Sequence, residues 1–193
     1  MSHTQTYLQE TEAISRLIDS DQVEKMVAEL VALRERKGRL FIIGLGGSAA
    51  NASHAVNDFR KLCGIEAYAP TDNVAELTAR ANDEGWAFIF GDWLQFANST
   101  DALFILSVGG GTETVSRPLV NAIAQTIGKG GTGTKIFAIV GRNGGHTKQR
   151  ADCCILIPTV NDIRVTPHTE GWQSVILHCI VSHPDLQRNK TKW

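Results

Sequence analysis

The sequence predicts an α/β fold, a doubly wound five-stranded parallel sheet with a helical extension at its N-terminus. After residue 38, short and almost continuously apolar segments alternate with amphipathic ones, which is typical of parallel strands covered on both faces by helices. Before residue 38, apolar residues recur at helical spacing. With 193 residues we expect a single domain over 1–193, with helices in 1–37 for packing or oligomerisation and the α/β core in 38–193.

The elements follow from this alternation in chain order. The first 37 residues are expected to form two helices, interrupted at Ser20 and Asp21. The predicted strands are Leu40–Gly44, Ala67–Ala69, Ala102–Ser107, Lys135–Gly141 and Cys153–Ile157. The predicted helices are Ala49–Cys63, Ala75–Ala81, Trp86–Ala97, Glu113–Ile127 and Glu170–Ser182, with a loop at Gly128–Gly133. In such a sheet, ligands bind beyond the carboxyl ends of the strands.

Composition excludes several classes of protein. A net charge of −1, from 19 basic and 20 acidic residues, gives no electrostatic footprint for nucleic acid. No apolar run is long enough for a membrane span, and the polar N-terminus lacks the apolar region of a signal peptide. The four cysteines show no CxxC spacing. We therefore expect a reduced, cytoplasmic protein with neither nucleic acid nor membrane as a partner.

Two glycine turns each follow a predicted strand and precede a predicted helix. In the first, Gly46, Gly47 and Ser48 expose backbone N–H groups at a helix N-terminus, which is a natural anion site. The second runs from Ser107 to Thr112, which is a good N-cap, and its glycines allow close approach to a ligand. Together they favour contact with a phosphate or a sugar over simple chain reversal.

Two nucleotide motifs compete with this interpretation. GLGGSA fits the looser dinucleotide fingerprint, with Glu66 near the position of a ribose-binding acid, but Glu66 precedes its strand instead of ending it. The segment GKGGTGTK (Gly128–Lys135) precedes a strand and lacks the Gly-Lys-Ser/Thr order of a P-loop. The first is the weaker option and the second is rejected.

Titratable side chains on two predicted helices suggest the chemistry. His54 and Asp58 stand at i and i+4, so they share a helix face. The C-terminal helix carries Glu170 and, eight residues later, His178, which places them about 12 Å apart along the axis. Spacing alone leaves open whether Glu170 and His178 converge on one point or act on different ends of a substrate.

These motifs resemble the sugar-isomerase (SIS) domain family, and specifically its phosphoheptose isomerase branch, over nearly the whole chain. The family pattern G-N-G-G-S-A-A-D-A-x-H-x-x-x-E corresponds to G-L-G-G-S-A-A-N-A-S-H-A-V-N-D here. The family's S-T-S-G-x-S loop corresponds to Ser107–Thr112, and its Asn-Asp-x-G segment to Asn82–Gly85. A C-terminal helix with a Gln and, eight residues later, a His corresponds to Glu170 and His178.

The resemblance implies a flavodoxin-like SIS fold and a homotetramer with active sites at subunit interfaces. It implies an enzyme that interconverts sedoheptulose 7-phosphate and a heptose 7-phosphate, with zinc held by His54, Asp58, Glu170 and His178. The family's base and acid map onto Asp58 and His178, and Glu170 is an alternative base. The residues expected to contact the substrate or its phosphate are Gly46, Gly47, Ser48, Asn51, Asp83, Ser107, Gly109, Gly110 and Thr112.

Several positions depart from the family pattern. Leu45 replaces an Asn, Asn51 an Asp, Asp58 a Glu and Glu170 a Gln, and Val108 and Gly109 replace a Thr and a Ser. The substitutions keep a possible zinc ligand at each of the four metal positions. Two other hypotheses remain open, an isomerase for a different ketose phosphate and a non-catalytic SIS-type module that binds a phosphosugar or bridges proteins.

Overall fold

A computed structural model describes residues 1–127 and 130–191. Five parallel strands form one sheet in the order β2-β1-β3-β4-β5. The strands are β1 (Leu40–Ile43), β2 (Ala67–Tyr68), β3 (Ala102–Ser107), β4 (Lys135–Val140) and β5 (Cys153–Leu156). Every predicted strand is confirmed to within one residue at each end, because β1, β3 and most of β4 are buried and their apolar runs are continuous.

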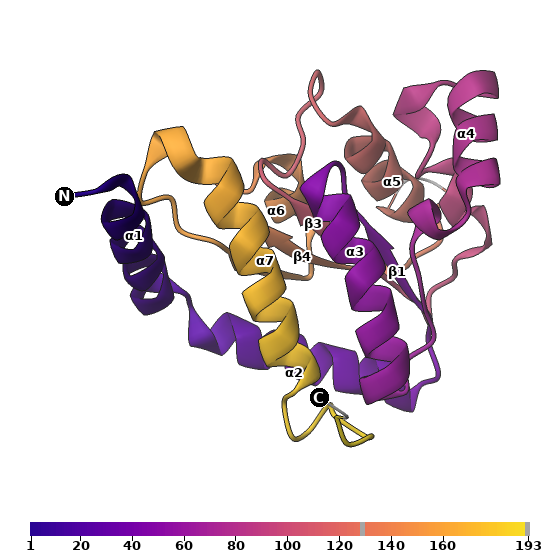
Figure 1. Ribbon diagram of the computed structural model, residues 1–193. Helices are drawn as coiled ribbons and strands as arrows, with labels where there is room; N and C mark the ends of the chain where they lie inside the picture. Colours follow the sequence, from indigo (N-terminus) through magenta and orange to yellow (C-terminus); the bar gives the residue numbers. More distant parts are fainter. Residues whose placement is uncertain (128–129, 192–193) are drawn as a thin grey trace.

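Helices cover both faces of the sheet (Figure 1). On one face lie α2 (Ser20–Glu35), α3 (Gly47–Asp58) and α7 (Val165–Val181), packed over a core that includes Phe59, Phe104 and Phe137. On the other lie α4 (Val74–Asp83), α5 (Arg117–Ile127) and α6 (Gly145–Arg150). The predicted doubly wound sheet is confirmed.

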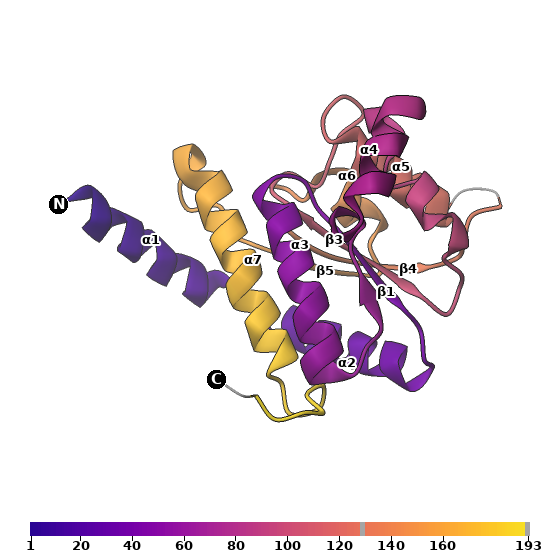
Figure 2. The same cartoon turned by 45° about the vertical axis from the view of Figure 1, so that its right-hand side comes forward.

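The N-terminal extension is helical, as predicted, and consists of α1 (His3–Leu17) followed by α2. Whereas α2 packs under the sheet, α1 projects from the body of the molecule (Figure 2). It is attached near the start of α7, where the Glu10 carboxylate accepts hydrogen bonds from Arg164 at 2.6 and 2.8 Å and lies 2.8 Å from Nε2 of His168. The Tyr7 ring stacks on that of His168, with centroids 4.4 Å apart.

Several predicted helix boundaries are wrong, for local reasons. The predicted helix Trp86–Ala97 forms two short 3₁₀ segments, Trp86–Phe88 and Asp92–Phe96, because Gly91 lies between them and glycine disfavours helix. The C-terminal helix begins at Val165, five residues earlier than expected, since its first turn accommodates Pro167. The short polar helix α6 was not predicted because it has no apolar periodicity.

The second glycine turn is longer than predicted. Thr112 is not the N-cap of α5, which begins at Arg117 with Pro118 at its second position. The Thr112 hydroxyl oxygen instead accepts a hydrogen bond from the N–H of Val115 at 3.0 Å and closes a tight turn. Residues 128 and 129 of the predicted loop Gly128–Gly133, and of the rejected GKGGTGTK motif, lie outside the described residues. Within the described ranges, no helix is both long and apolar enough to span a membrane.

Candidate functional site

The two glycine turns lie side by side at the switch point of the sheet. β1 and β3 are adjacent and in register from Leu40–Ala102 to Ile43–Ile105. The chain leaves β1 towards β2 and leaves β3 towards β4, so the connections diverge and open a crevice at the carboxyl ends. A cavity of about 490 Å³ lies there. Its lining residues are Leu45, Ser107, Val108, Gly109, Gly111, Thr112, Val115, Ser116, Arg142 and Asn143.

The second glycine turn is held in place by its own hydrogen bonds and by α6. The Gly110 N–H donates to the Ser107 hydroxyl at 3.0 Å. The Gly110 carbonyl accepts from the N–H and the hydroxyl of Thr147, at 2.9 and 2.7 Å. Gly110 has a φ of +69°, and a methyl group built on it would collide with the Gly144 carbonyl. Here glycine is required both by conformation and by close packing.

The first glycine turn faces an internal carboxylate. A methyl group built on Gly47 would lie 2.8 Å from Oε1 of Glu170 and closer still to Oε2. Glu170 therefore occupies the N-terminus of α3, where a carboxylate is favoured by the helix dipole. Asn51 fixes this end of α7 by donating to the Glu170 carbonyl at 2.9 Å and to Oε1 of Gln173 at 3.1 Å. Ser48 is buried, and its hydroxyl has no partner within the described residues.

Two turns further along the same two helices, His54, Asp58 and His178 form a compact cluster. Nε2 of His54 lies 3.0 Å from Nε2 of His178 and 3.2 Å from Oδ2 of Asp58. Nε2 of His178 is 3.7 Å from the same oxygen. The Asp58 side chain is only 5% exposed, whereas both imidazoles are half exposed and border a surface cavity of about 400 Å³ with Ser182.

The cluster fits a metal ion. Bonds of 2.0–2.2 Å at tetrahedral angles separate neighbouring ligand atoms by about 3.3 Å, close to the three distances observed here. Two imidazole nitrogens and one carboxylate oxygen are a common donor set for zinc, and three protein ligands leave a fourth position open on the exposed side. Among the described residues, this is the group of His, Cys, Asp and Glu side chains that converges closely enough to hold a metal.

The structure separates the four expected metal ligands into two groups. α3 and α7 run side by side in the same direction, so Gly47 lies beside Glu170 and His54 beside His178 (Figure 1). Glu170 is thereby aligned with the first turn of α3 and is not part of the metal-type cluster. The question left open by the spacing of Glu170 and His178 is answered in favour of two separate positions.

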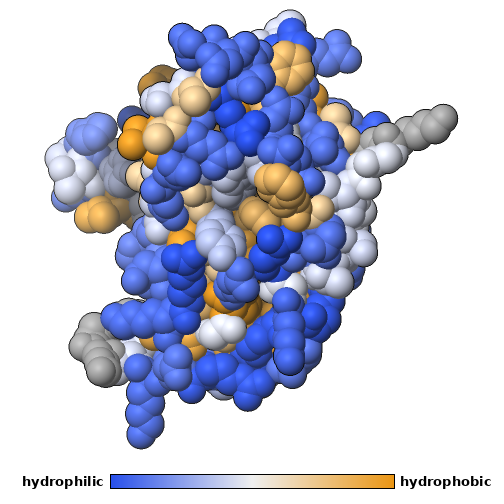
Figure 3. All heavy atoms as spheres, turned by 90° about the vertical axis from the view of Figure 1, so that its right-hand side faces the viewer, coloured by the Kyte–Doolittle hydropathy of each residue, from blue (hydrophilic) through white to orange (hydrophobic). Residues whose placement is uncertain are grey.

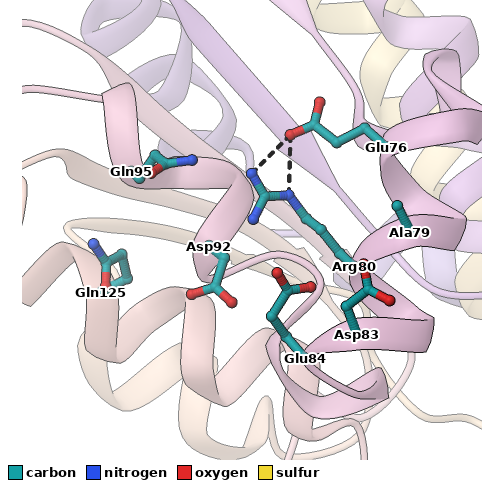
Figure 4. A pocket seen from close by; sticks show the side chains of 8 residues that line it. All are labelled: Glu76, Ala79, Arg80, Asp83, Glu84, Asp92, Gln95 and Gln125. Atoms are coloured by element: carbon teal, nitrogen blue, oxygen red, sulfur yellow. Dashed lines mark hydrogen bonds and ion pairs between the residues drawn. The ribbon is translucent and has the colours of Figure 1, made fainter.

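Asp83 lies apart from both groups. It borders a cavity of about 560 Å³ between α4 and the segment Asp92–Phe96, together with Glu84 and Asp92 (Figure 4). Arg80 also borders this cavity and is paired with Glu76 at 2.9 Å. The face of the molecule on this side is mostly hydrophilic, with separate apolar groups (Figure 3). Asp83 does not line the cavity at the glycine turns.

The sequence analysis missed several residues that line this cavity, among them Ser116 and Arg142. Ser116 directly precedes α5 and lines the cavity where Thr112 was expected to open the helix. Arg142 follows β4 and lines the same cavity. The signals were present, since a serine before Arg-Pro is typical of a helix start, and Gly141–Gly145 is a third glycine-rich turn beyond a strand adjacent to β3.

The remaining candidates lie away from this chemistry. Glu66 lies at the amino end of β2, opposite the glycine turns, and accepts a hydrogen bond from the Tyr68 hydroxyl at 2.6 Å. This position does not suit a ribose-binding acid. Burial raises the pKa of the Cys63 thiol to about 12 and that of Cys154 to about 11, so neither supplies a thiolate near neutral pH.

Known proteins resemble this chain over most of its length. It is 26% identical over 191 residues to the phosphoheptose isomerase of Helicobacter pylori strain P12, covering 92% of this chain and 93% of the other. It is 29% identical over 182 residues to a probable phosphoheptose isomerase of Thermoplasma volcanium, covering 91% and 87%. No family model matches the chain.

A solved structure has the same fold. The phosphoheptose isomerase of Francisella tularensis superposes with a TM-score of 0.80 at 19% identity, covering 94% of this chain and 97% of that one. The similarities in sequence and fold confirm the resemblance to phosphoheptose isomerases that the motifs indicated.

Proposed function

From its similarity to phosphoheptose isomerases over about nine-tenths of its length, we propose that this protein is a phosphosugar isomerase that converts sedoheptulose 7-phosphate to a heptose 7-phosphate. The observation that carries the proposal is the pairing of α3 with α7. Their amino ends lie near the cavity at the switch point, since Leu45, two residues before α3, lines it. Thr169 of α7 lies against Gly141, next to the lining residue Arg142. Two turns on, the two helices hold the cluster of His54, Asp58 and His178.

The cavity at the glycine turns suits the phosphate end of the substrate. Gly109, Gly111 and three residues with hydroxyl groups, Ser107, Thr112 and Ser116, line it. We propose that their N–H and hydroxyl groups contribute to phosphate binding. Anchoring the phosphate away from the reacting carbons lets remote binding energy orient the reacting end. Gly46, Gly47, Ser48 and Asn51 do not line this cavity, and Gly47 and Asn51 lie against Glu170 instead.

We assign the base to Glu170. Isomerisation removes a proton from the carbon beside a carbonyl and returns it one carbon over, and a carboxylate with room to accept the proton is a suitable base. The Glu170 carboxylate is partly exposed and has no ion pair within the described residues. Asp58, by contrast, is buried and lies within 3.7 Å of both imidazoles. We propose that His178 exchanges a proton with a substrate oxygen through Nδ1, because its Nε2 faces the metal position.

We propose zinc as the metal of the cluster of His54, Asp58 and His178, because two imidazoles and one carboxylate are a zinc donor set. When bound, it would act as a Lewis acid on a substrate oxygen within reach of the cluster. Asp58 would be the anionic ligand of the set and would offset part of the charge of the ion.

The decisive experiment is an assay of purified protein with sedoheptulose 7-phosphate, alongside metal analysis and a chelated sample. We expect turnover, and we expect His178→Ala and Glu170→Gln each to lower kcat by about 10²- to 10⁴-fold. His183→Ala is the control, since His183 lies beyond α7, 3.3 Å from Glu24, outside the cluster. Absence of turnover with any metal, or full activity of His178→Ala, would contradict the proposal.

Activity measured with a panel of other ketose phosphates would show whether sedoheptulose 7-phosphate or a related sugar phosphate is the preferred substrate. Comparing Glu170→Gln with Asp58→Asn separates the base from the metal-holding role. If Glu170 is the base, Glu170→Gln loses turnover but retains its metal, whereas Asp58→Asn loses both. Ligand binding without turnover in the wild type would instead indicate a binding module.

We propose that the chain works as a homotetramer. Support comes from α1, which projects from the body and exposes 61% of both Leu8 and Leu17, and from the half-exposed imidazoles. Light scattering of the purified protein should give four times the chain mass. A mass of one chain at working concentration would be inconsistent with it.

A further inference from the structure

The cavity at the glycine turns contains one charged side chain, Arg142. The other lining residues are glycines, Asn143 and hydroxyl-bearing or apolar side chains. Cδ of Arg142 lies 3.8 Å from a methyl group built on Gly109, so the side chain passes over the second glycine turn. Within the described residues its guanidinium has no hydrogen bond or ion pair. An unpaired guanidinium at a cavity wall is a strong donor for a bidentate anion such as phosphate.

The turn itself has few donors left for an anion. The Gly110 N–H donates to the Ser107 hydroxyl oxygen, and the Thr112 N–H donates to the Val115 carbonyl at 2.8 Å. Among the glycine amides, those of Gly109 and Gly111 have no partner within the described residues. A phosphate that carries nearly two negative charges therefore needs positive charge from outside the turn, and Arg142 is the lining residue that provides it.

The backbone holds Arg142 in this place. Its φ is +52°, in the left-handed region that a residue with a side chain seldom adopts. The turn around it is tied to the second glycine turn on both sides. The Gly141 N–H donates to the Ser107 carbonyl at 3.2 Å, and the His146 N–H donates to the Gly111 carbonyl at 2.9 Å. The second glycine turn and the turn Gly141–Gly145 thus form one hydrogen-bonded wall of the cavity. Arg142, the cationic residue of this wall, has an unfavourable backbone conformation that the surrounding hydrogen bonds maintain.

We propose that Arg142 binds the phosphate group of the substrate and supplies the main preference for phosphorylated over unphosphorylated sugar. The identity of the sugar rests on the proposed function, whereas binding of the phosphate group does not. Arg142 is a binding residue for the phosphate end of the substrate, and it is separate from the positions of Glu170 and His178 along α7.

The test compares the wild type with Arg142→Gly, Arg142→Lys and Arg150→Ala in titrations with inorganic phosphate and with sedoheptulose 7-phosphate. Glycine accepts the left-handed backbone, so Arg142→Gly should fold normally. Arg150 is an exposed arginine at the end of α6, outside the cavity. The variant Arg150→Ala therefore removes the same charge from the protein without changing the cavity. Circular dichroism and thermal melting verify that all four proteins are folded.

We expect Arg142→Gly to bind phosphate about 10- to 100-fold more weakly, which is the range for losing charge-assisted hydrogen bonds. Arg142→Lys should be intermediate, because lysine keeps the charge but not the planar pair of donors, and Arg150→Ala should match the wild type. Equal phosphate affinity of Arg142→Gly and wild type would overturn the proposal. So would an equal loss in Arg150→Ala, since that would indicate a general charge effect.

Failure of this proposal is distinguishable from failure of the proposed function. Phosphate binding that depends on Arg142 in a protein without isomerase activity would support the Arg142 site and exclude the enzyme. Isomerase activity with unchanged kcat/KM in Arg142→Gly would exclude the Arg142 site and support the enzyme.

Discussion

At the scale of single residues, the glycine at position 47 and the placement of the Glu170 carboxylate depend on each other. A side chain at position 47 would occupy the space of the Glu170 carboxylate, so the glycine of the first turn makes room for a carboxylate of the same chain. The first turn has the features of a phosphate site, with a helix N-terminus and several glycines. The negative charge beside it, however, is the carboxylate of Glu170. This arrangement supports the proposal that a substrate phosphate binds at the second turn.

Gly47→Ala tests this relation. The added methyl group collides only with the flexible end of Glu170, and alanine favours helix by about 0.8–1 kcal/mol over glycine. We expect unchanged or higher stability in thermal melts, and a fall in kcat of about 10- to 100-fold because the base is displaced. Gly171→Ala is a matched control in α7, with open space around it and the same gain in propensity. Equal activity of the two variants would count against Glu170 as the base.

Gly110→Ala should behave in the opposite way. Its φ of +69° and the nearby Gly144 carbonyl leave no room for a methyl group. We expect a loss of at least about 2 kcal/mol in the free energy of unfolding, from the left-handed strain and the collision together. Urea denaturation measures it. A midpoint equal to that of the wild type would mean that the two turns are not rigidly packed.

At the scale of elements, the attachment of α1 depends on Glu10. The Arg164 guanidinium and the His168 imidazole hold the pKa of this carboxyl well below its usual value of 4.5. A carboxyl with a lowered pKa stabilises the folded state fully above its unfolded pKa. That contribution declines as the pH falls below about 4.5.

Glu10→Gln should lower the melting temperature at pH 7, and its difference from the wild type should shrink as the pH is lowered below 4.5. The control is Glu12→Gln, which removes an exposed pair with Arg16 that contributes little. A difference that is constant with pH would show that Glu10 acts through packing and not through its charge.

The sequence alone predicted the strands and helices better than it predicted which side chains from different elements lie close together. The strands could be predicted because buried parallel strands are continuously apolar, and the His54–Asp58 pair because one helix turn fixes its geometry. The position of Glu170 could not be predicted, since it depends on how α7 aligns with α3 on the same face of the sheet. Arg142 was missed because a single basic residue in a turn has no periodicity. It lines the cavity because the turn after β4 lies beside the turn after β3, which depends on the strand order.

At the scale of the whole molecule, the metal-type cluster joins two helices from distant parts of the chain. Zinc that binds the folded state should therefore stabilise it, by about 2.7 kcal/mol at a hundredfold excess over Kd. We expect a zinc-dependent rise in melting temperature for the wild type, no rise for the double variant His54→Ala, His178→Ala, and a normal rise for His183→Ala. An equal rise in all three would place the zinc elsewhere.

The separation of His54 and His178 by 124 residues also has a consequence for biosynthesis. α7 follows all five strands in the sequence, so a growing chain that has not yet reached His178 lacks the complete cluster. The contact also requires the intervening parallel strands, whose pairings are non-local and slow to form. The glycine turns can thus form before residue 178 is made, whereas the three side chains of the cluster come together only after α7 has packed beside α3.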